Sequence, residues 1–155
     1  MQTFLPFPDF EASARALDDR RLGKQRIEAL QVLRSLTRPA YGWKHHPAVA
    51  MWRGFEEALG AYGVAVCREW RQRGFTDTCE AQILDELDDV GAATPPPTQA
   101  ELAAAGRLPP WLGDDAVHRS HRSALLRKDP ERYAEQFGDE DPTQPYVWPS
   151  SPDTT

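Results

Sequence analysis

The stretch LDDRRLGKQRIEALQVLRSL, residues 17–36, predicts the helix around which the rest of the chain is organised. On a helix drawn at about 100° per residue, its apolar side chains fall on one side: Leu22, Ala29, Leu33 and Leu36. The polar side chains fall on the other side or at its edge: Arg20, Lys24, Glu28 and Gln31. We therefore predict a helix from about Asp18 to Leu36 with one buried face and one charged face.

The charged face holds one carboxylate among several cations: Glu28 lies near Arg20, Arg21, Lys24 and Arg26. Like charges at neighbouring positions repel, so a face that only kept the protein soluble would mix its charge signs. The cluster therefore indicates a binding partner.

The pair Lys24/Glu28 is open to two interpretations. Its spacing is that of an ordinary helix salt bridge. Alternatively, a carboxylate held among cations stays ionised and can relay protons or stabilise a cationic centre at a sugar. In that case the Lys24 amine, crowded by arginines, has its pKa lowered, which favours its nucleophilic neutral form.

The length of 155 residues favours one globular domain, large enough to bury a core without disulfides or metals. Cys67 and Cys79 are the only cysteines, and neither a signal peptide nor a run of roughly 20 apolar residues is present. We expect a cytoplasmic monomer with reduced thiols and no membrane insertion.

The net charge of −6 speaks against bulk coating of nucleic acid. Residues 1–75, however, carry 12 Lys and Arg against 8 Asp and Glu, which fits a basic working surface on an acidic body.

Apolar periodicity and capping residues predict further helices along the chain. The expected segments are Asp9–Leu17, a long core helix from Pro47 to about Gly74 with His46 as N-cap, Asp77–Asp89, a short helix between Thr98 and Gly106, Asp114–Arg127, and a new start at Asp129-Pro130. No repeat and no alternating strand pattern is present. The fold prediction is all-α: one compact helical domain over residues 1–149 with long loops and an extended C-terminal segment, and a disordered tail at 150–155.

The motif HRSHR places His118 and His121 one helical turn apart, with Arg119 and Arg122 interleaved. Such alternating donors suit phosphate oxygens. Histidines at this spacing can also share a metal, although the arginines oppose a divalent cation. The third possibility is a solvated or structurally satisfied helix.

Other candidates lie in loops or at a helix start. His46 precedes Pro47, so it can cap the helix or help to bind phosphate at its N-terminus. Trp43, Trp111 and Trp148 can stack on a base or anchor their loops to the core. A Gly-rich phosphate loop, a dinucleotide fingerprint, C-x-x-C and His-Glu-x-x-His are missing, so we expect neither a cofactor nor a metal.

Taken in order, several stretches resemble the small all-helical pyrimidine-dimer DNA glycosylases of the phage endonuclease V type, and more closely their uncharacterised bacterial members. These stretches are LDDRRLGKQRIEAL, HHPAVAMWRGFEEALGAYGVAVCREWRQRGF and, more loosely, PPWLGDDAVHRSHRSALLRKDPERY with PYVWP. The resemblance covers a little over half of the chain. It implies a DNA glycosylase and abasic-site lyase that acts on damaged or modified pyrimidines after base extrusion.

In that family an α-amine attacks C1′ of the damaged nucleotide, a helix glutamate assists, and an imine intermediate permits strand cleavage. The resemblance assigns the glutamate's role to Glu28, and DNA contacts to Arg20, Arg21 and His46. The bulky Gln2 should block removal of Met1, so the nucleophile is the α-amine of Met1, the amine of Lys24, or absent. In the last case the protein is a relative that kept the fold and lost or changed the chemistry. The reference pKa of an α-amine, about 8, leaves more neutral form at pH 7 than that of lysine, about 10.4.

Two other functions remain open on the same residues. One is a non-catalytic nucleic-acid or nucleotide-binding module that uses the same cationic helix face. For the glycosylase and for this module alike, the further expected nucleic-acid contacts are Trp111, His118, Arg119, His121 and Arg122. The other is a metal-dependent hydrolase built on the four histidines.

Overall fold

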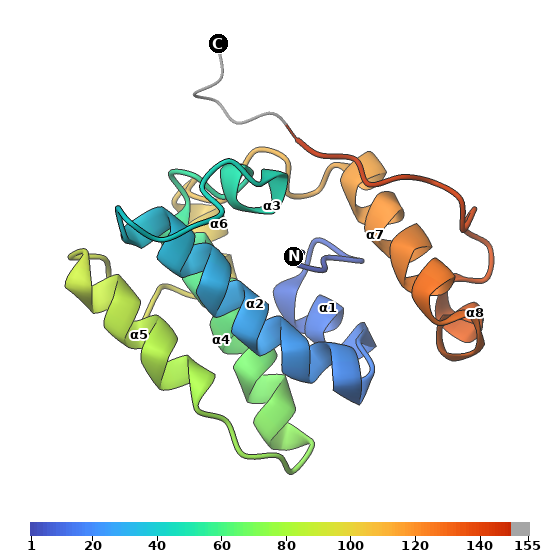
Figure 1. Cartoon of the computed structure of the whole chain (residues 1–155), viewed down its shortest axis with the longest axis horizontal. Coiled ribbons are helices and arrows are strands. Elements are labelled where there is room, and N and C mark those ends of the chain that lie inside the picture. The colour runs from blue at the N-terminus through green and yellow to red at the C-terminus, as the bar shows by residue number, and fades with distance from the viewer. Residues whose placement is uncertain (150–155) are drawn as a thin grey trace.

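The structure, a computed structural model, describes residues 1–149, and the regular elements in this part of the chain are all helices (Figure 1). In chain order they are α1 (Phe10–Ala16), α2 (Asp19–Thr37), α3 (Pro47–Ala50), α4 (Glu56–Gln72), α5 (Cys79–Asp89), α6 (Gln99–Ala104), α7 (Asp115–Lys128) and α8 (Pro130–Phe137). The all-α prediction is confirmed.

Most helix starts follow from side-chain caps that the sequence indicates. The Asp9 carboxylate accepts a hydrogen bond from the backbone nitrogen of Ala12 (2.8 Å), and Asp18 accepts one from that of Arg21 (3.4 Å). Thr98 and Glu101 form the predicted capping box at the start of α6. These hydrogen bonds satisfy amide groups that have no partner within their helix.

The prediction of one helix from Pro47 to Gly74 is wrong, because the chain turns between α3 and α4. His46 caps α3 as expected, but α3 has a single turn, and Gly54 adopts a φ of +87° that favours glycine. The turn places the Trp52 indole in the core, where its Nε1 donates to Thr3 Oγ1 (3.0 Å). The apolar periodicity identified the buried face correctly, since Leu59, Tyr62 and Val66 are all buried.

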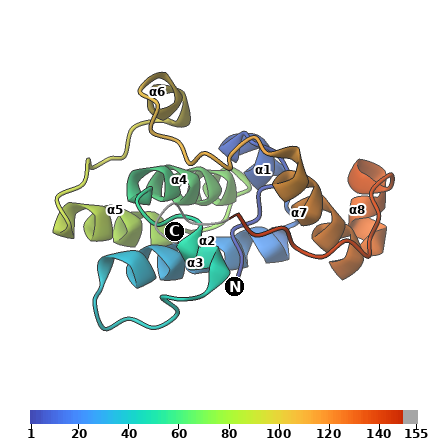
Figure 2. The same cartoon turned by 90° about the horizontal axis from the view of Figure 1, so that it is seen from above.

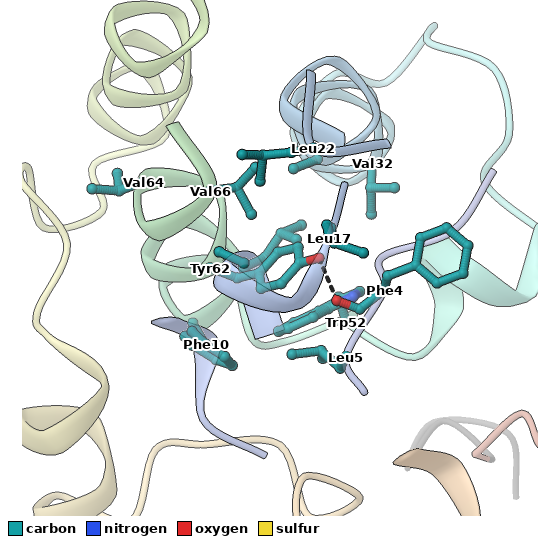
Figure 3. Close-up of a cluster of buried hydrophobic side chains, with 14 of the residues drawn as sticks. Phe4, Leu5, Phe10, Leu17, Leu22, Val32, Trp52, Tyr62, Val64 and Val66 are labelled. Carbon is teal, nitrogen blue, oxygen red and sulfur yellow. Dashed lines mark hydrogen bonds between the residues drawn. The ribbon is translucent and has the colours of Figure 1, made fainter. Parts of the chain in front are cut away.

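Helices α2, α4 and α5 pack against one another, and α4 also contacts α1 and α6. Two glycines of α4 permit the close approach of α5. A Cβ atom at Gly60 would lie 2.7 Å from Leu87 Cδ1, and one at Gly63 would lie 2.7 Å from Ile83 Cδ1. Side chains from these helices and from the N-terminal segment form the core. Figure 3 shows the part of it where the N-terminal segment, α1, α2 and α4 meet.

The N-terminal segment, residues 1–7, lies between the α1–α5 group and α7 (Figure 1). Phe4 and Leu5 are buried there and belong to the core. Helices α5 and α8 lie at opposite ends of the molecule, and the segment 138–149 runs from α8 back toward α3 and the N-terminus in both views (Figures 1 and 2). Both ends of the described chain therefore meet near α3.

The predictions about the whole chain have different outcomes. The disordered tail predicted at 150–155 lies outside the described residues. Among residues 1–149, no helix combines the length and the apolar character needed to cross a membrane. The single-domain and monomer predictions stay predictions.

Candidate active site

Glu28 lies on the charged face of α2 and contacts the backbone of the N-terminal segment. Its Oε2 accepts a hydrogen bond from the backbone nitrogen of Gln2 (3.1 Å), and its Oε1 lies 3.4 Å from Lys24 Nζ. The Glu28 side chain is 13 % exposed, whereas that of Lys24 is 75 % exposed. An ion pair with so exposed a partner contributes little stability. The more buried contact of Glu28 is therefore the one with the chain's N-terminus.

Side chains of the helices hold the backbone of the N-terminal segment. The buried Gln25 of α2 accepts from the Phe4 nitrogen (2.9 Å) and donates to the Gln2 carbonyl (2.8 Å), much as a neighbouring strand would. The Tyr62 hydroxyl of α4 donates to the Phe4 carbonyl (2.6 Å; Figure 3). Because buried backbone groups need such partners, the contacts fix the path of the chain up to Met1.

The HRSHR motif of α7 also forms hydrogen bonds with the backbone of the N-terminal segment. His121 Nδ1 accepts from the backbone nitrogen of Leu5 (2.9 Å), and His118 Nδ1 donates to the Leu5 carbonyl (2.8 Å). His118 Nε2 accepts from the nitrogen of Gly113 (2.9 Å), which assigns the proton of the neutral ring to Nδ1. Arg122 adds a hydrogen bond to the Pro6 carbonyl (2.9 Å). The motif is thus a clamp on Leu5 and Pro6.

Burial keeps both clamp histidines neutral. Burial, with a smaller contribution from the neighbouring His118, lowers the pKa of His121 to about 3. Burial is also the main reason why the pKa of His118 lies below its usual value. Neutral imidazoles are required here, because a protonated His121 could not accept the hydrogen bond from Leu5.

We expect acid to destabilise the protein through His121. Its folded pKa lies below the unfolded value near 6.5, so its contribution is complete above pH 6.5 and falls by up to about 1.4 kcal/mol per unit as pH drops toward 3. His121→Asn keeps an acceptor near the Nδ1 position but cannot titrate. Urea unfolding at pH 7, 6 and 5 should give this variant a shallower dependence on pH, by about one proton. The exposed control His45→Asn should retain the parent dependence; equal slopes for parent and His121→Asn would contradict the assignment.

A cleft of about 210 Å³ opens at Met1 and Glu28. Its lining comes from the N-terminal segment, from α2, from the end of α7 and from the C-terminal segment: Met1, Gln2, Phe4, Arg21, Lys24, Gln25, Glu28, Lys128 and Tyr146. The cleft brings together the three residues predicted to carry the chemistry, Met1, Lys24 and Glu28.

The sequence interpretation missed several lining residues. Gln2 and Gln25 gave no signal, because an isolated glutamine fits any surface. Lys128 stands in the charged last turn of α7, where basic residues are common. Tyr146 lies in the aromatic segment PYVWP, but the sequence does not indicate which part of the protein this segment packs against.

His46 lies beside the cleft. Its Nδ1 accepts from the backbone nitrogen of Ala48 (3.0 Å), so this ring atom serves the cap. Burial lowers its pKa, the positive charge of the N-terminal amine lowers it further, and the negative charge of Glu28 acts in the opposite direction. The imidazole meets the rings of Trp43 and Trp148 edge-on, with both centroid distances 6.1 Å.

Three predicted nucleic-acid contacts are buried, which corrects the sequence interpretation. His118 and His121 face the N-terminal segment, and Trp111 Nε1 donates to the Met51 carbonyl (2.7 Å) within the core. A side chain without exposed surface cannot touch DNA in this conformation. Trp111 is a loop anchor, the commoner use of such an aromatic.

The predicted cations differ in how far they are paired. Arg21 lies 3.1 Å from Asp18, Arg119 lies 2.8 Å from Asp115, and Arg122 lies 2.8 Å from Glu140. Arg20 is exposed and makes no ion pair within residues 1–149. Arg20 is therefore the freest cation of the charged face, followed by Lys24, whose contact with Glu28 leaves its side chain 75 % exposed.

The four histidines do not come together. Two clamp Leu5, His46 caps α3 and His45 is exposed. In the part of the chain that the structure describes, no three His, Cys, Asp or Glu side chains are grouped so that they could hold a metal. This arrangement offers no support for the metal-dependent hydrolase.

Fold and site together define an all-helical protein whose own N-terminal segment contributes to a cleft containing a carboxylate. A family model described as pyrimidine dimer DNA glycosylase matches residues 1–83, which include Met1, Lys24, Glu28 and His46. The chain belongs to this family, and with it to the DNA-binding glycosylases of DNA repair. Neither the curated proteins nor the solved structures contain a significant match.

Proposed function

We propose that the protein is a glycosylase and abasic-site lyase for damaged or modified pyrimidines, with the α-amine of Met1 as nucleophile and Glu28 as its carboxylate partner. The observation that carries the proposal is the 3.1 Å hydrogen bond from the Gln2 nitrogen to Glu28 Oε2. In support, Met1 lines the same cleft as Glu28, and its neighbour Gln2 contacts the Glu28 carboxylate directly. The family match supplies the substrate class, DNA.

The reaction balances with these two groups and water, which protonates the departing base, accepts the proton from C2′ and finally hydrolyses the imine to free the amine. The lone pair of the neutral amine forms a bond to C1′ while the bond from C1′ to the base breaks, and the base leaves with that electron pair and takes up a proton. Loss of the amine proton and opening of the C1′–O4′ bond then give an imine, with Glu28 moving the proton between nitrogen and O4′. Removal of a proton from C2′ finally expels the 3′ phosphate.

Lys24 is the second candidate nucleophile, and its exposure argues against it. Its side chain is 75 % exposed, and its Nζ lies 3.4 Å from Glu28 Oε1, the geometry of an ordinary surface ion pair. A side chain held so loosely is poorly positioned to attack C1′. We therefore assign Lys24 to DNA contact.

If Met1 is removed in the mature protein, the reactive amine would be the nitrogen of Gln2 itself, already 3.1 Å from Glu28. Intact-mass measurement distinguishes the two forms. Both keep the nucleophile at the chain's N-terminus.

The charged face of α2 should contact DNA phosphates through its cations. We expect Arg20→Ala to weaken DNA binding across sequences and to reduce the slope of log K against log salt by about 0.9, one phosphate contact. The control Arg68→Ala removes an equal charge from a residue that pairs with Glu80 between α4 and α5. Equal salt slopes for the two variants would make Arg20 an ordinary surface charge.

Borohydride reduction in the presence of duplex DNA with an abasic site tests the proposal. Hydride reduces the imine to a stable amine, so protein and DNA become covalently joined. We expect this adduct from the parent protein. DNA binding without an adduct on abasic, dimer-containing or single-stranded substrates would instead identify a non-catalytic nucleic-acid-binding module.

A further inference from the structure

We propose that Trp43 is a stacking platform for a DNA base that has been taken out of the helix beside the cleft. Trp43 is the most exposed of the large hydrophobic side chains in the described part of the chain, at 61 %. The inference rests on the proposed function in one respect, that the cleft of Met1 and Glu28 is where the DNA strand lies.

The backbone at Trp43 indicates that this exposure is enforced. Its φ is +71°, a left-handed conformation that a bulky side chain rarely adopts and that costs energy. The carbonyl of Trp43 accepts from the backbone nitrogen of His46 (2.9 Å), and Arg53 Nη2 donates to the next carbonyl, that of Lys44 (2.8 Å). The loop is thus held in a shape that presents an indole to solvent.

A series of ring contacts connects Trp43 to the cleft. The indole lies against His46, His46 lies against Trp148, and Trp148 lies against Tyr146, with centroid distances of 6.1, 6.1 and 5.3 Å. Tyr146 lines the cleft with Met1 and Glu28. A strand whose reacting sugar occupies the cleft and which follows this aromatic row would bring the base of a nearby nucleotide to Trp43.

The surroundings of Trp43 suit a nucleic-acid strand. No Asp or Glu occurs between Glu28 and Glu56, although the chain has a net charge of −6. Lys44 and Arg53 make no ion pair within residues 1–149, and His45 is exposed. Cations beside an exposed aromatic are the usual means of holding single-stranded DNA, because phosphates meet the charges while a base stacks on the ring.

The test compares two oligonucleotides of the same length, one of thymidines and one of base-free tetrahydrofuran units, by fluorescence anisotropy. Trp43→Ala should weaken binding of the thymidine strand by about 5- to 150-fold, the range for one stacked base. It should leave binding of the base-free strand within about twofold. Trp43→Phe should retain most of the affinity, because it keeps a flat ring.

Two controls separate the ring from other effects. Trp43→Gly removes the ring together with the backbone strain, so it should match Trp43→Ala in affinity and exceed it in Tm. Phe75→Ala removes another exposed aromatic, one that stacks on Trp70 at 4.1 Å, and should change neither affinity.

Equal losses on both strands, no loss on either, or no binding of the thymidine strand by the parent would overturn the inference. The outcome is independent of catalysis. A parent protein that binds through Trp43 but forms no borohydride adduct would contradict the proposed chemistry while supporting the stacking role.

Discussion

Glu28→Gln should lower the single-turnover rate of strand cleavage by about 10²- to 10⁴-fold, the usual contribution of a proton-transferring side chain. Glutamine is nearly isosteric and can still accept the hydrogen bond from the Gln2 nitrogen, so the N-terminal segment should keep its position. DNA affinity and Tm should therefore stay close to those of the parent. Cleavage of duplex DNA with one abasic site, measured with enzyme in excess, checks the rate.

Lys24→Gln is the matched control, since it removes the other member of the 3.4 Å pair. It should lower DNA affinity modestly and leave the single-turnover rate at saturating protein nearly unchanged. If Glu28→Gln loses DNA binding or several degrees of Tm together with activity, Glu28 is a structural residue.

An uncleaved N-terminal extension of a few residues should abolish borohydride trapping, lowering its rate by more than about 10²-fold. The amine would then lie several residues from the cleft, whereas a displacement on the order of 1 Å is already costly for a reacting group. The same extension at the C-terminus is the control and should leave trapping unchanged. Intact mass confirms which N-terminus each sample carries.

Lys24→Ala completes this experiment. If the extended protein still traps and Lys24→Ala does not, the nucleophile is the lysine amine. Retained trapping by Lys24→Ala together with loss in the extended protein is the expected result.

Local patterns predicted most of the helices because the signals involved are themselves local. The faces of α2 follow from the spacing of Leu22, Ala29 and Leu33, all of which are buried. The starts of α1 and α6 follow from caps within three residues. The break before α4 was missed because Pro47 and the apolar periodicity fit a continuous helix equally well. The turn is explained by long-range contacts: Trp52 Nε1 donates to Thr3, 49 residues away, and the Met51 carbonyl accepts from Trp111, 60 residues away.

Site residues that share one helix could be predicted from the sequence, whereas contacts between distant segments could not. Lys24 and Glu28 share a face of α2, so their proximity followed from spacing. The roles of His118 and His121 depend on Leu5, more than 110 residues away. Nothing in HRSHR distinguishes a clamp on backbone groups from a site for phosphate, because the same donors suit both.

The identity of the nucleophile is tested most directly by locating the DNA on the protein after borohydride trapping. The abasic adduct of the untagged protein is digested with a protease and a nuclease, and mass spectrometry identifies the modified peptide. We expect one modified nitrogen, the α-amine of the N-terminal peptide that begins with Met1, or with Gln2 if intact mass shows that Met1 has been removed. Modification of the peptide that contains Lys24, with an unmodified N-terminus, would contradict this expectation.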